Sequence, residues 1–392
     1  MTAKERERMA ISDSIKYVGF DDAELEVFES QYPTEGISYN SYVILDEKIA
    51  VMDTVDPRGT DAFFENLREA LGDKKPSYLV VQHMEPDHAA NIEKLADMYP
   101  DMELIGSAAA GKLISQFFES DLQGRFKAVK ENDTLSLGSH TLQFIMAPMV
   151  HWPEVMVTYE QSEKVLFSAD AFGTFSALQN DEDWIADASH YYFNIVGKYG
   201  AQVQALLKKA QGLDISVIAP LHGPVHKDDI GFVVDKYNAW SSYEPDREGI
   251  FMPYASIHGN TEKAVLQFAK ELEELGETVV TMDLTKEDVS EAVEQAFLYD
   301  RVIFASATYD LEIFPVMNDL LHHLKIKNYQ NRKVGIIENG SWSPQAGRKM
   351  REYLEEMKNI TIAEPVITIR STRKPEDAAA FKALAEAMRK NG

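Results

Sequence analysis

Apolar runs alternate with amphipathic stretches along the second part of the chain. The amphipathic stretches have helical spacing and cover 261–275, 287–297, 315–324, 345–357 and 375–390. The runs between them are apolar along almost their whole length, as expected for parallel strands covered on both faces. These runs are 250–254, 278–284, 301–306, 333–338 and 361–369. Such alternation predicts a doubly wound α/β domain of flavodoxin size.

The first part of the chain has a different pattern, in which short strands dominate. The predicted strands are 25–29, 38–44, 48–52, 78–81, 104–106, 134–137, 141–147, 155–159 and 165–168. Helical spacing appears at 61–71 and 91–98. This mixture predicts an α+β sandwich of two sheets with helices outside.

A polar segment with proline and glycine, YEPDREG at 243–249, separates the two patterns. It follows a predicted helix at 228–240 and precedes the first strand of the second part. We therefore expect two domains, residues 1–248 and 249–392, as the length of 392 residues also suggests.

Composition narrows the classes of partner and cofactor. Lys and Arg total 39 and Asp and Glu total 64, so the formal net charge is −25. That charge repels nucleic acids and anionic lipid surfaces, and we expect neither as a partner. The absence of cysteine excludes disulfides, iron–sulfur clusters and a built-in rubredoxin, so any metal must be held by His and carboxylate. No signal peptide and no membrane-spanning apolar run is recognised, so we expect a cytoplasmic protein.

The segment VVQHMEPDH at 80–88 carries the densest set of potential metal ligands. An apolar strand there ends in His83, Glu85, Asp87 and His88. Residues two apart on an extended chain point the same way, so the first three can converge while the chain turns toward a helix. A surface loop could hold these residues by chance, but their position at a strand end favours a site.

Three later residues share this position at the end of an apolar strand. They are His151, Asp170 and His222, after the runs 144–148, 165–169 and 215–221. Taken alone, each has an ordinary interpretation as a loop residue or a helix cap. Taken together, they extend the candidate ligand set to seven residues.

The remaining histidines have other expected roles. His226 is a second candidate for the last ligand position, and His190 could lie just behind the ligands. We expect His140, in a Gly-Ser-His turn, to be exposed, and His322 and His323 to be structural.

The order of the motifs, H-x-E-x-D-H followed by H, D and H, resembles the metallo-β-lactamase superfamily. In its hydrolases the first motif is H-x-H-x-D-H and usually holds zinc. Glu85 stands where the second His would be, and an anionic oxygen ligand shifts the preference toward iron or manganese. The seven residues suffice for two metals if one carboxylate bridges them, and Asp170 is the candidate bridge.

The second part opens with a strand that passes through a small loop into a helix, IFMPYASIHGNTE at 250–262. Backbone N–H groups and the helix N-terminus together make an anion site. The loop contains neither Lys nor Arg, so it would hold phosphate by neutral donors, which suits flavin mononucleotide (FMN). A plain capped turn between strand and helix would have a similar sequence. The candidate residues are Ser256, Ile257, His258, Gly259, Asn260 and Thr261.

Two further loops follow the strands predicted at 301–306 and 333–338, at the same edge of the expected sheet. Each supplies an aromatic residue, Tyr309 or Trp342, that could stack on an isoalloxazine ring. The candidate residues are Ala307, Thr308, Tyr309 and Asp310 in one loop, and Asn339, Gly340, Ser341 and Trp342 in the other.

A metallo-β-lactamase-like domain with H-x-E-x-D-H, followed by a flavodoxin-like domain, resembles the flavodiiron proteins, also called A-type flavoproteins. The resemblance covers essentially the whole chain and includes HWPE at 151–154. It implies an N-terminal αββα sandwich and then a doubly wound parallel sheet, in the short form of the family without a rubredoxin domain. The second flavin loop lacks a proline that is common in the family, and the third lacks a Tyr-Gly pair, which could change the flavin potential or the electron donor.

The resemblance also implies two irons, FMN and the reduction of O2 to water, of NO to N2O, or of both. Electrons would come from a separate rubredoxin or a reduced deazaflavin, and the subunits would form a head-to-tail homodimer or a dimer of dimers. The position matching His88 is not always coordinated in the family. One iron would be held by His83, Glu85 and His151, the other by Asp87, His88 and His222, and Asp170 would bridge them.

Two alternatives remain. A dinuclear metallo-hydrolase could carry the flavodoxin domain as a passenger, or the flavin could shuttle electrons beside an idle metal site. Glu85 and the aromatic flavin loops argue against the hydrolase, and the presence of all seven candidate ligands argues against the idle site.

Overall fold

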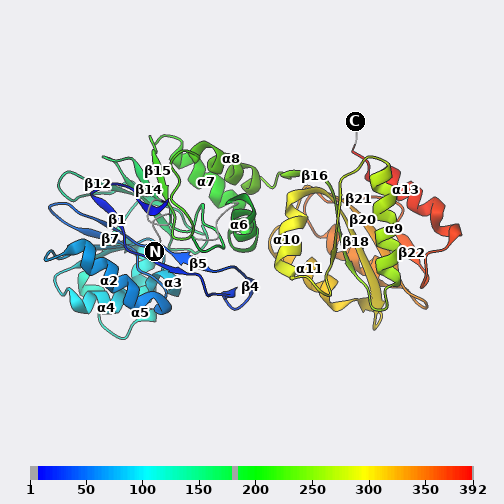
Figure 1. The fold of residues 1–392 in the computed structure, drawn as a ribbon, viewed down its shortest axis with the longest axis horizontal. Coiled ribbons are helices and arrows are strands. Elements are labelled where there is room, and N and C mark those ends of the chain that lie inside the picture. The colour runs from blue at the N-terminus through cyan, green and yellow to red at the C-terminus, as the bar shows by residue number, and fades with distance from the viewer. Residues whose placement is uncertain (1–7, 179–183, 391–392) are drawn as a thin grey trace. The chain divides into compact units, whose positions relative to one another are not determined.

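The computed structural model describes residues 8–178 and 184–390. The chain divides into two compact units, Met1–Asn238 and Ala239–Gly392 (Figure 1). This division falls inside helix α8 (Ile230–Ser241), slightly before the expected boundary at 248/249, which lies in strand β16 (Arg247–Ala255). Within the described residues, no helix has the length and apolar character needed to cross a membrane.

The two large sheets of the first unit face each other. One has the order β1-β6-β7-β8-β9-β10 and the other the order β11-β12-β13-β14-β15. The bounds of the first sheet are β1 (Ile15–Tyr17), β6 (Tyr42–Ile44), β7 (Ala50–Met52), β8 (Tyr78–Val81), β9 (Glu103–Ser107) and β10 (Phe126–Val129). Those of the second are β11 (Thr134–Ser136), β12 (Thr141–Met146), β13 (Met156–Glu160), β14 (Val165–Phe167) and β15 (Val217–Ala219).

Side chains from both sheets of the first unit form one apolar core. Tyr42 and Val80 from the first sheet pack with Phe144 and Phe167 from the second. Helices cover the outer faces of the sheets (Figure 1), which completes the predicted αββα sandwich. These helices are α2 (Thr60–Leu71), α4 (Ile92–Met98) and α5 (Ala108–Phe117) on one side, and α6 (Trp184–Tyr191), α7 (Gly200–Ala210) and α8 on the other.

The second unit is a parallel sheet in the order β17-β16-β18-β20-β21, with β22 also paired to β20. Counted from the first strand of the unit, this is the flavodoxin-like order 2-1-3-4-5, so the predicted fold is confirmed. The strands are β17 (Val279–Asp283), β18 (Tyr299–Tyr309), β20 (Lys333–Asn339), β21 (Thr361–Ile362) and β22 (Ile367–Ile369). The helices are α9 (Asn260–Glu274), α10 (Val289–Leu298), α11 (Pro315–Ile326), α12 (Ala346–Glu355) and α13 (Ala378–Met388).

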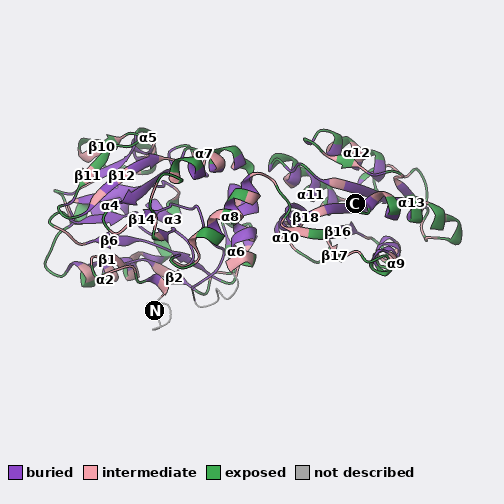
Figure 2. Ribbon diagram, turned by 90° about the horizontal axis from the view of Figure 1, so that it is seen from above, coloured by how far each residue is buried: buried purple, intermediate pink, exposed green. Residues whose placement is uncertain are grey.

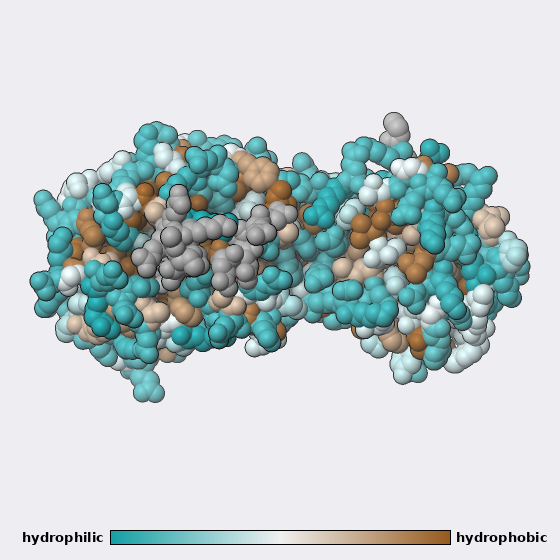
Figure 3. All heavy atoms as spheres, viewed as in Figure 1, coloured by the Kyte–Doolittle hydropathy of each residue, from teal (hydrophilic) through white to brown (hydrophobic). Residues whose placement is uncertain are grey.

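Helices lie on both faces of this sheet, which explains its almost fully apolar strands (Figure 2). Phe268 of α9 and Phe381 of α13 pack on Ile303 and Ile337 of the central strands. The face shown in Figure 3 is mostly hydrophilic, in keeping with the net charge of −25.

Three predictions about strands were wrong in detail. The run 38–44 is not one strand but β5 (Ile37–Tyr39) and β6, which belong to different sheets. The run 361–369 is not one strand but the two short strands β21 and β22, with Pro365 between them. Proline has no N–H to donate to a neighbouring strand, which accounts for the interruption. Strand β18 continues to Tyr309, beyond the predicted end at 306, and turns back through β19 (Glu312–Ile313).

The expectation that His140 is exposed was also wrong. The residue is 7% exposed and lies between two carboxylates. Its Nδ1 is 2.7 Å from Oδ2 of Asp46, and its Nε2 is 3.0 Å from Oε1 of Glu163. Asp46 lies between β6 and β7 and Glu163 between β13 and β14, so His140 ties together the ends of the two sheets. Burial by itself would lower the pKa of His140. The carboxylates of Glu163 and Asp46 have the larger effect and raise this pKa above its ordinary value.

We predict that His140→Ala lowers the free energy of unfolding by about 1–3 kcal/mol at pH 6, because two carboxylates lose their shared partner. The pKa of His140 is raised in the folded state, so its contribution is complete below the ordinary histidine pKa of about 6.5 and is lost as the pH rises through the folded-state value. Urea unfolding at pH 6 and pH 9 measures the difference between wild type and variant. An equal difference at both pH values would contradict this account.

Candidate metal centre and strand-end loops

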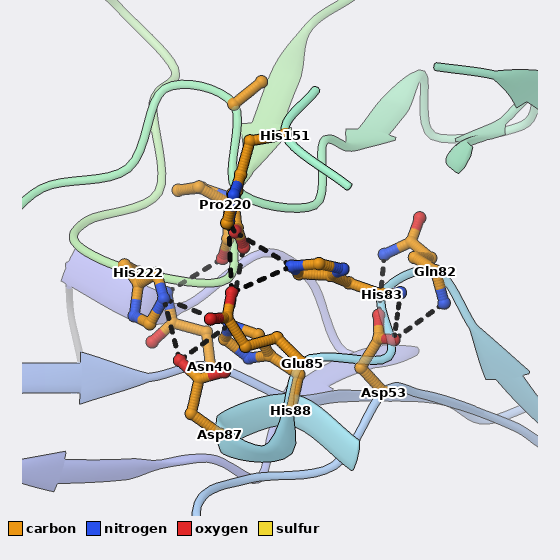
Figure 4. A network of polar contacts seen from close by, with 12 residues as sticks. Asn40, Asp53, Gln82, His83, Glu85, Asp87, His88, His151, Pro220 and His222 are labelled. Carbon is orange, nitrogen blue, oxygen red and sulfur yellow. Dashed lines mark hydrogen bonds and ion pairs between the residues drawn. The ribbon is translucent and has the colours of Figure 1, made fainter. Parts of the chain in front are cut away.

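Four strand ends deliver the seven candidate ligands to one place. Figure 4 labels these ligands apart from Asp170. Strand β8 is buried along its whole length and leads to His83 and Glu85. Pro86 then begins helix α3 (Pro86–Ala89), a position that proline favours because its ring is preorganised for a first helical turn. This short helix turns Asp87 and His88 back toward the site. The other three ligands follow strands: His151 after β12, Asp170 after β14 and His222 after β15.

One group of ligand atoms gathers around His83, Glu85 and His151. The Nε2 atom of His83 is 3.2 Å from Oε2 of Glu85, and Nε2 of His151 is 3.1 Å from the same oxygen. Oδ2 of Asp170 is 3.3 Å from Nε2 of His83 and 3.0 Å from Nε2 of His151. These four residues offer atoms close enough together to hold one metal ion.

A second group gathers around Asp87, His88 and His222. The Nε2 atoms of the two histidines are 3.0 Å apart. Oδ2 of Asp87 is 3.2 Å from Nε2 of His88 and 3.4 Å from Nε2 of His222. These three residues could hold a second ion.

Asp170 joins the two groups through its two oxygens. Oδ2 faces His83 and His151, whereas Oδ1 is 3.4 Å from Nε2 of His88. The carboxylate is 1% exposed. One side chain thus presents one oxygen to each group, which is the arrangement that a bridging ligand requires.

The donor chemistry of the cluster fits cations. His83 and His222 contact acceptors through Nδ1, at 2.8 Å from Oε1 of Glu154 and 2.8 Å from the carbonyl oxygen of Ser38. With Nδ1 donating in these bonds, each ring can offer its Nε2 atom to a metal ion on the side of the carboxylates. Both oxygens of Asp87 and Oδ1 of Asp170 are buried without a hydrogen-bond partner. Converging lone pairs of this kind repel one another unless a cation lies between them.

The raised pKa values of two histidines in the cluster also show that this site favours positive charge. Burial lowers the pKa of His83, but the carboxylates of Asp170, Glu154 and Glu85 outweigh it and hold that pKa well above its ordinary value. Burial also lowers the pKa of His151, yet Asp170 and Glu85 raise it to about 9. A field that favours a proton here also favours a metal ion, and a carboxylate-rich set suits iron or manganese.

Sequence reasoning missed two buried carboxylates behind the ligands. Glu154 contacts His83 and also accepts a hydrogen bond from the backbone N–H of Met84, at 2.9 Å. Asp53 accepts hydrogen bonds from the backbone and side chain of Gln82, at 2.7 and 2.9 Å. Asp53 follows strand β7, so the strand-end rule could have found it. Glu154 ends the HWPE segment that contributes to the family resemblance, but its contact with His83 has no sequence signal, because only the fold brings the two residues together.

The remaining histidines lie outside the two groups. Nδ1 of His226 is 2.8 Å from Oδ2 of Asp229, so this residue does not take the last ligand position. The ring of His190 contacts Phe175, with 5.3 Å between ring centroids. His322 and His323 are on helix α11 of the other unit.

The first predicted flavin loop leaves donors available. Ser256 Oγ is buried and has no hydrogen-bond partner. Helix α9 follows Gly259 (φ +80°) and no side chain caps its N-terminus. Unused N–H groups in the first turn of a helix form an anion site, and here the buried hydroxyl lies beside them in sequence.

The other two loops place apolar surface at the same edge of the sheet. Trp342 is 72% exposed and Tyr309 is 46% exposed. Ala307, Thr308 and Tyr309 belong to strand β18 rather than to a loop, and the turn consists of Asp310 and Leu311, both with positive φ. The side chain of Thr308 accepts hydrogen bonds from the backbone at the start of α12. The side chain of Asn339 is bonded to Ser371, which follows the neighbouring strand β22.

Known proteins resemble this chain over nearly its whole length. The model of the ODP family beta lactamase matches residues 37–223. A nitric oxide reductase of Moorella thermoacetica is 30% identical over 94% of this chain and 95% of its own length. A mutant of the flavo di-iron protein of Thermotoga maritima has 25% identity and a TM-score of 0.86, covering 96% of both chains. The chain belongs to the flavodiiron protein family. The rubredoxin oxygen:oxidoreductase of Desulfovibrio gigas, another similar structure, has 27% identity and a TM-score of 0.91 over 97% of both chains.

Membership of the flavodiiron family confirms the predicted pairing of a metallo-β-lactamase-like unit with a flavodoxin-like unit. The names of its relatives place the chain among the oxidoreductases. The individual ligand and flavin contacts predicted from the sequence stay predictions that the geometry supports.

We predict that Asp170→Ala lowers the metal content of both groups, because one oxygen of Asp170 faces each of them. Metal analysis after anaerobic loading with Fe(II) should show a fall from about two ions per chain to well below one. Asp229→Ala removes an acidic partner from His226 outside the cluster and serves as the control, which should keep both ions. An Asp170→Ala protein that retains two ions would refute the bridging role.

Proposed function

We propose that this flavodiiron protein reduces O2 to water, NO to N2O, or both, at a di-iron centre that receives electrons from FMN. The observation that carries the proposal is the position of Asp170, with one oxygen toward each of two ligand groups. With two irons bound, a shared carboxylate would keep them close, and such a centre would supply a site for both atoms of O2 or for two NO molecules. When bound, two irons and one flavin would supply the four electrons needed to convert O2 to two waters, whereas two electrons suffice to convert two NO molecules to N2O and water.

Side chains of the first unit would hold the irons and shape the site. His83, Glu85 and His151 would hold one, and Asp87, His88 and His222 the other. Aromatic rings surround His222: the centroids of Phe28, Tyr39 and Tyr191 lie 5.6, 5.8 and 5.7 Å from that of its imidazole. These buried rings keep bulk water away from the imidazole of His222.

Side chains of the second unit would hold FMN. The Ser256 hydroxyl and the uncapped N-terminus of α9 offer neutral donors to the phosphate. Tyr309 and Trp342 are exposed at the carboxyl edge of the sheet, where ligands of doubly wound folds bind. Stacking on the isoalloxazine ring would bury their apolar surface.

The electron donor and the assembly remain proposals. The structural relative from Desulfovibrio gigas is named for a rubredoxin, and a separate rubredoxin or a reduced deazaflavin in the cytoplasm would serve here. A head-to-tail homodimer, or a dimer of such dimers, would bring the flavin of one subunit to the irons of another.

Single-turnover reoxidation tests the proposed activity. The anaerobically reduced protein is mixed in parallel with O2 and with NO. We expect rapid reoxidation by at least one gas, because the flavin and the irons would give up their electrons together. Flavin absorbance reports the rate. Slow reoxidation by both gases in a protein that carries iron and flavin would contradict the proposal and reopen the alternatives of a hydrolase or an electron shuttle.

Trp342→Ala tests the proposed flavin contact. Loss of one stacked ring should weaken FMN binding about threefold to tenfold, as expected for roughly 0.5–1.5 kcal/mol of aromatic contact. Fluorescence titration of the apoprotein with FMN measures the dissociation constant, and iron content should not change. Phe232→Ala removes an exposed aromatic residue of the first unit and is the matched control. Equal FMN affinity in all three proteins would exclude Trp342 from the site.

A further inference from the structure

The two ligand groups differ in what lies behind their imidazole rings. Nδ1 of His83 is 2.8 Å from a carboxylate oxygen of Glu154, which is 1% exposed. Nδ1 of His222 is 2.8 Å from a neutral acceptor, the carbonyl oxygen of Ser38. Nδ1 of His88 is buried and has no hydrogen-bond partner. The support behind the ring therefore decreases from His83 in the first group to His222 and then His88 in the second.

A carboxylate behind a metal-binding imidazole does two things. It fixes the ring and its tautomer, and its charge raises the basicity of the nitrogen that faces the metal. Glu154 is itself held in place by the N–H of Met84 on its side chain, and its backbone carbonyl accepts a bond from the Ser107 hydroxyl at 2.7 Å. A carbonyl fixes the ring without adding a full charge, and an unbonded Nδ1, as in His88, does neither.

The carboxylates in contact with the rings point the same way. Oxygens of Glu85, Glu154 and Asp170 lie 3.2, 2.8 and 3.3 Å from nitrogens of His83 in the first group. Oxygens of Asp87 and Asp170 lie 3.2 and 3.4 Å from Nε2 of His88 in the second. A divalent cation gains more from the first set, because attraction between charges is strong where water is excluded.

We propose that the two metal positions are unequal and that Glu154 sets the difference. The position formed by His83, Glu85 and His151 retains its ion, whereas the position formed by Asp87, His88 and His222 exchanges its ion readily. Glu154 is a positioning residue, since it acts through His83 rather than on the metal. The inference rests on the proposed dinuclear site and adds an order of loading, with the first position filled before the second.

Timed removal of metal by a chelator tests the proposal. The purified full-length chain is loaded anaerobically with Fe(II), mixed with an excess of a chelator that colours on binding iron, and followed by absorbance. Wild type should lose iron in two phases of equal amplitude whose rates differ at least tenfold. His222→Ala assigns the phases, because it should abolish the fast one and leave the slow one.

Glu154→Gln tests the cause of the difference. This variant keeps the shape and an acceptor oxygen but removes the charge, so the slow phase should accelerate about tenfold while the fast phase stays unchanged. Glu160→Gln is the matched control, because Glu160 is also fully buried in the first unit but bonds only to backbone N–H groups outside the cluster. It should leave both phases unchanged, whereas a general loss of structure would accelerate both.

The outcomes separate this inference from the proposed function. If wild type loses two irons in one phase, or if Glu154→Gln changes the fast phase or neither phase, the proposed asymmetry is wrong and the dinuclear site stands. If wild type never holds more than one iron, the dinuclear site fails and the asymmetry fails with it.

Discussion

The buried carboxylate of Asp170 is the contact on which the arrangement of the first unit depends. Imidazole nitrogens from both ligand groups lie within 3.4 Å of its two oxygens. Carboxylates and imidazole lone pairs are costly to bury together, because each loses its hydration and most face another acceptor. The fold concentrates this desolvation cost in one cluster, where a bound cation would offset it.

The surrounding sandwich explains how such a cluster stays in position. Strands β8, β14 and β15 are almost entirely buried, so apolar packing fixes where each strand ends. The ligands follow directly after these ends and have little freedom to separate. Hydrogen bonds to Glu154 and to the carbonyl oxygen of Ser38 then fix the rings of His83 and His222. The second unit uses its strand ends differently, since it offers unused N–H groups and exposed aromatic rings that suit a phosphate and a flat heterocycle.

Much of this could be predicted from the sequence. The spacing of apolar residues along the chain indicated both kinds of sheet, because apolar strands and amphipathic helices have distinct local patterns. The strand-end rule found all seven residues that meet in the cluster, since every one follows an apolar run or the turn after it. Prediction failed where the cause is tertiary. Local sequence gives no sign of the contacts that Glu154 and His140 make. Only packing brings Glu154 to His83, and His140 to Asp46 and Glu163. Pro365 could have warned that 361–369 is not a continuous strand.

An anomalous-diffraction map of the iron-loaded protein, recorded at the iron absorption edge, tests the central claim most directly. The claim is that one buried carboxylate joins two metal positions. The account predicts two iron peaks in the first unit, one against Oδ1 and one against Oδ2 of Asp170. A single peak, or a second peak that Asp170 does not contact, would contradict it.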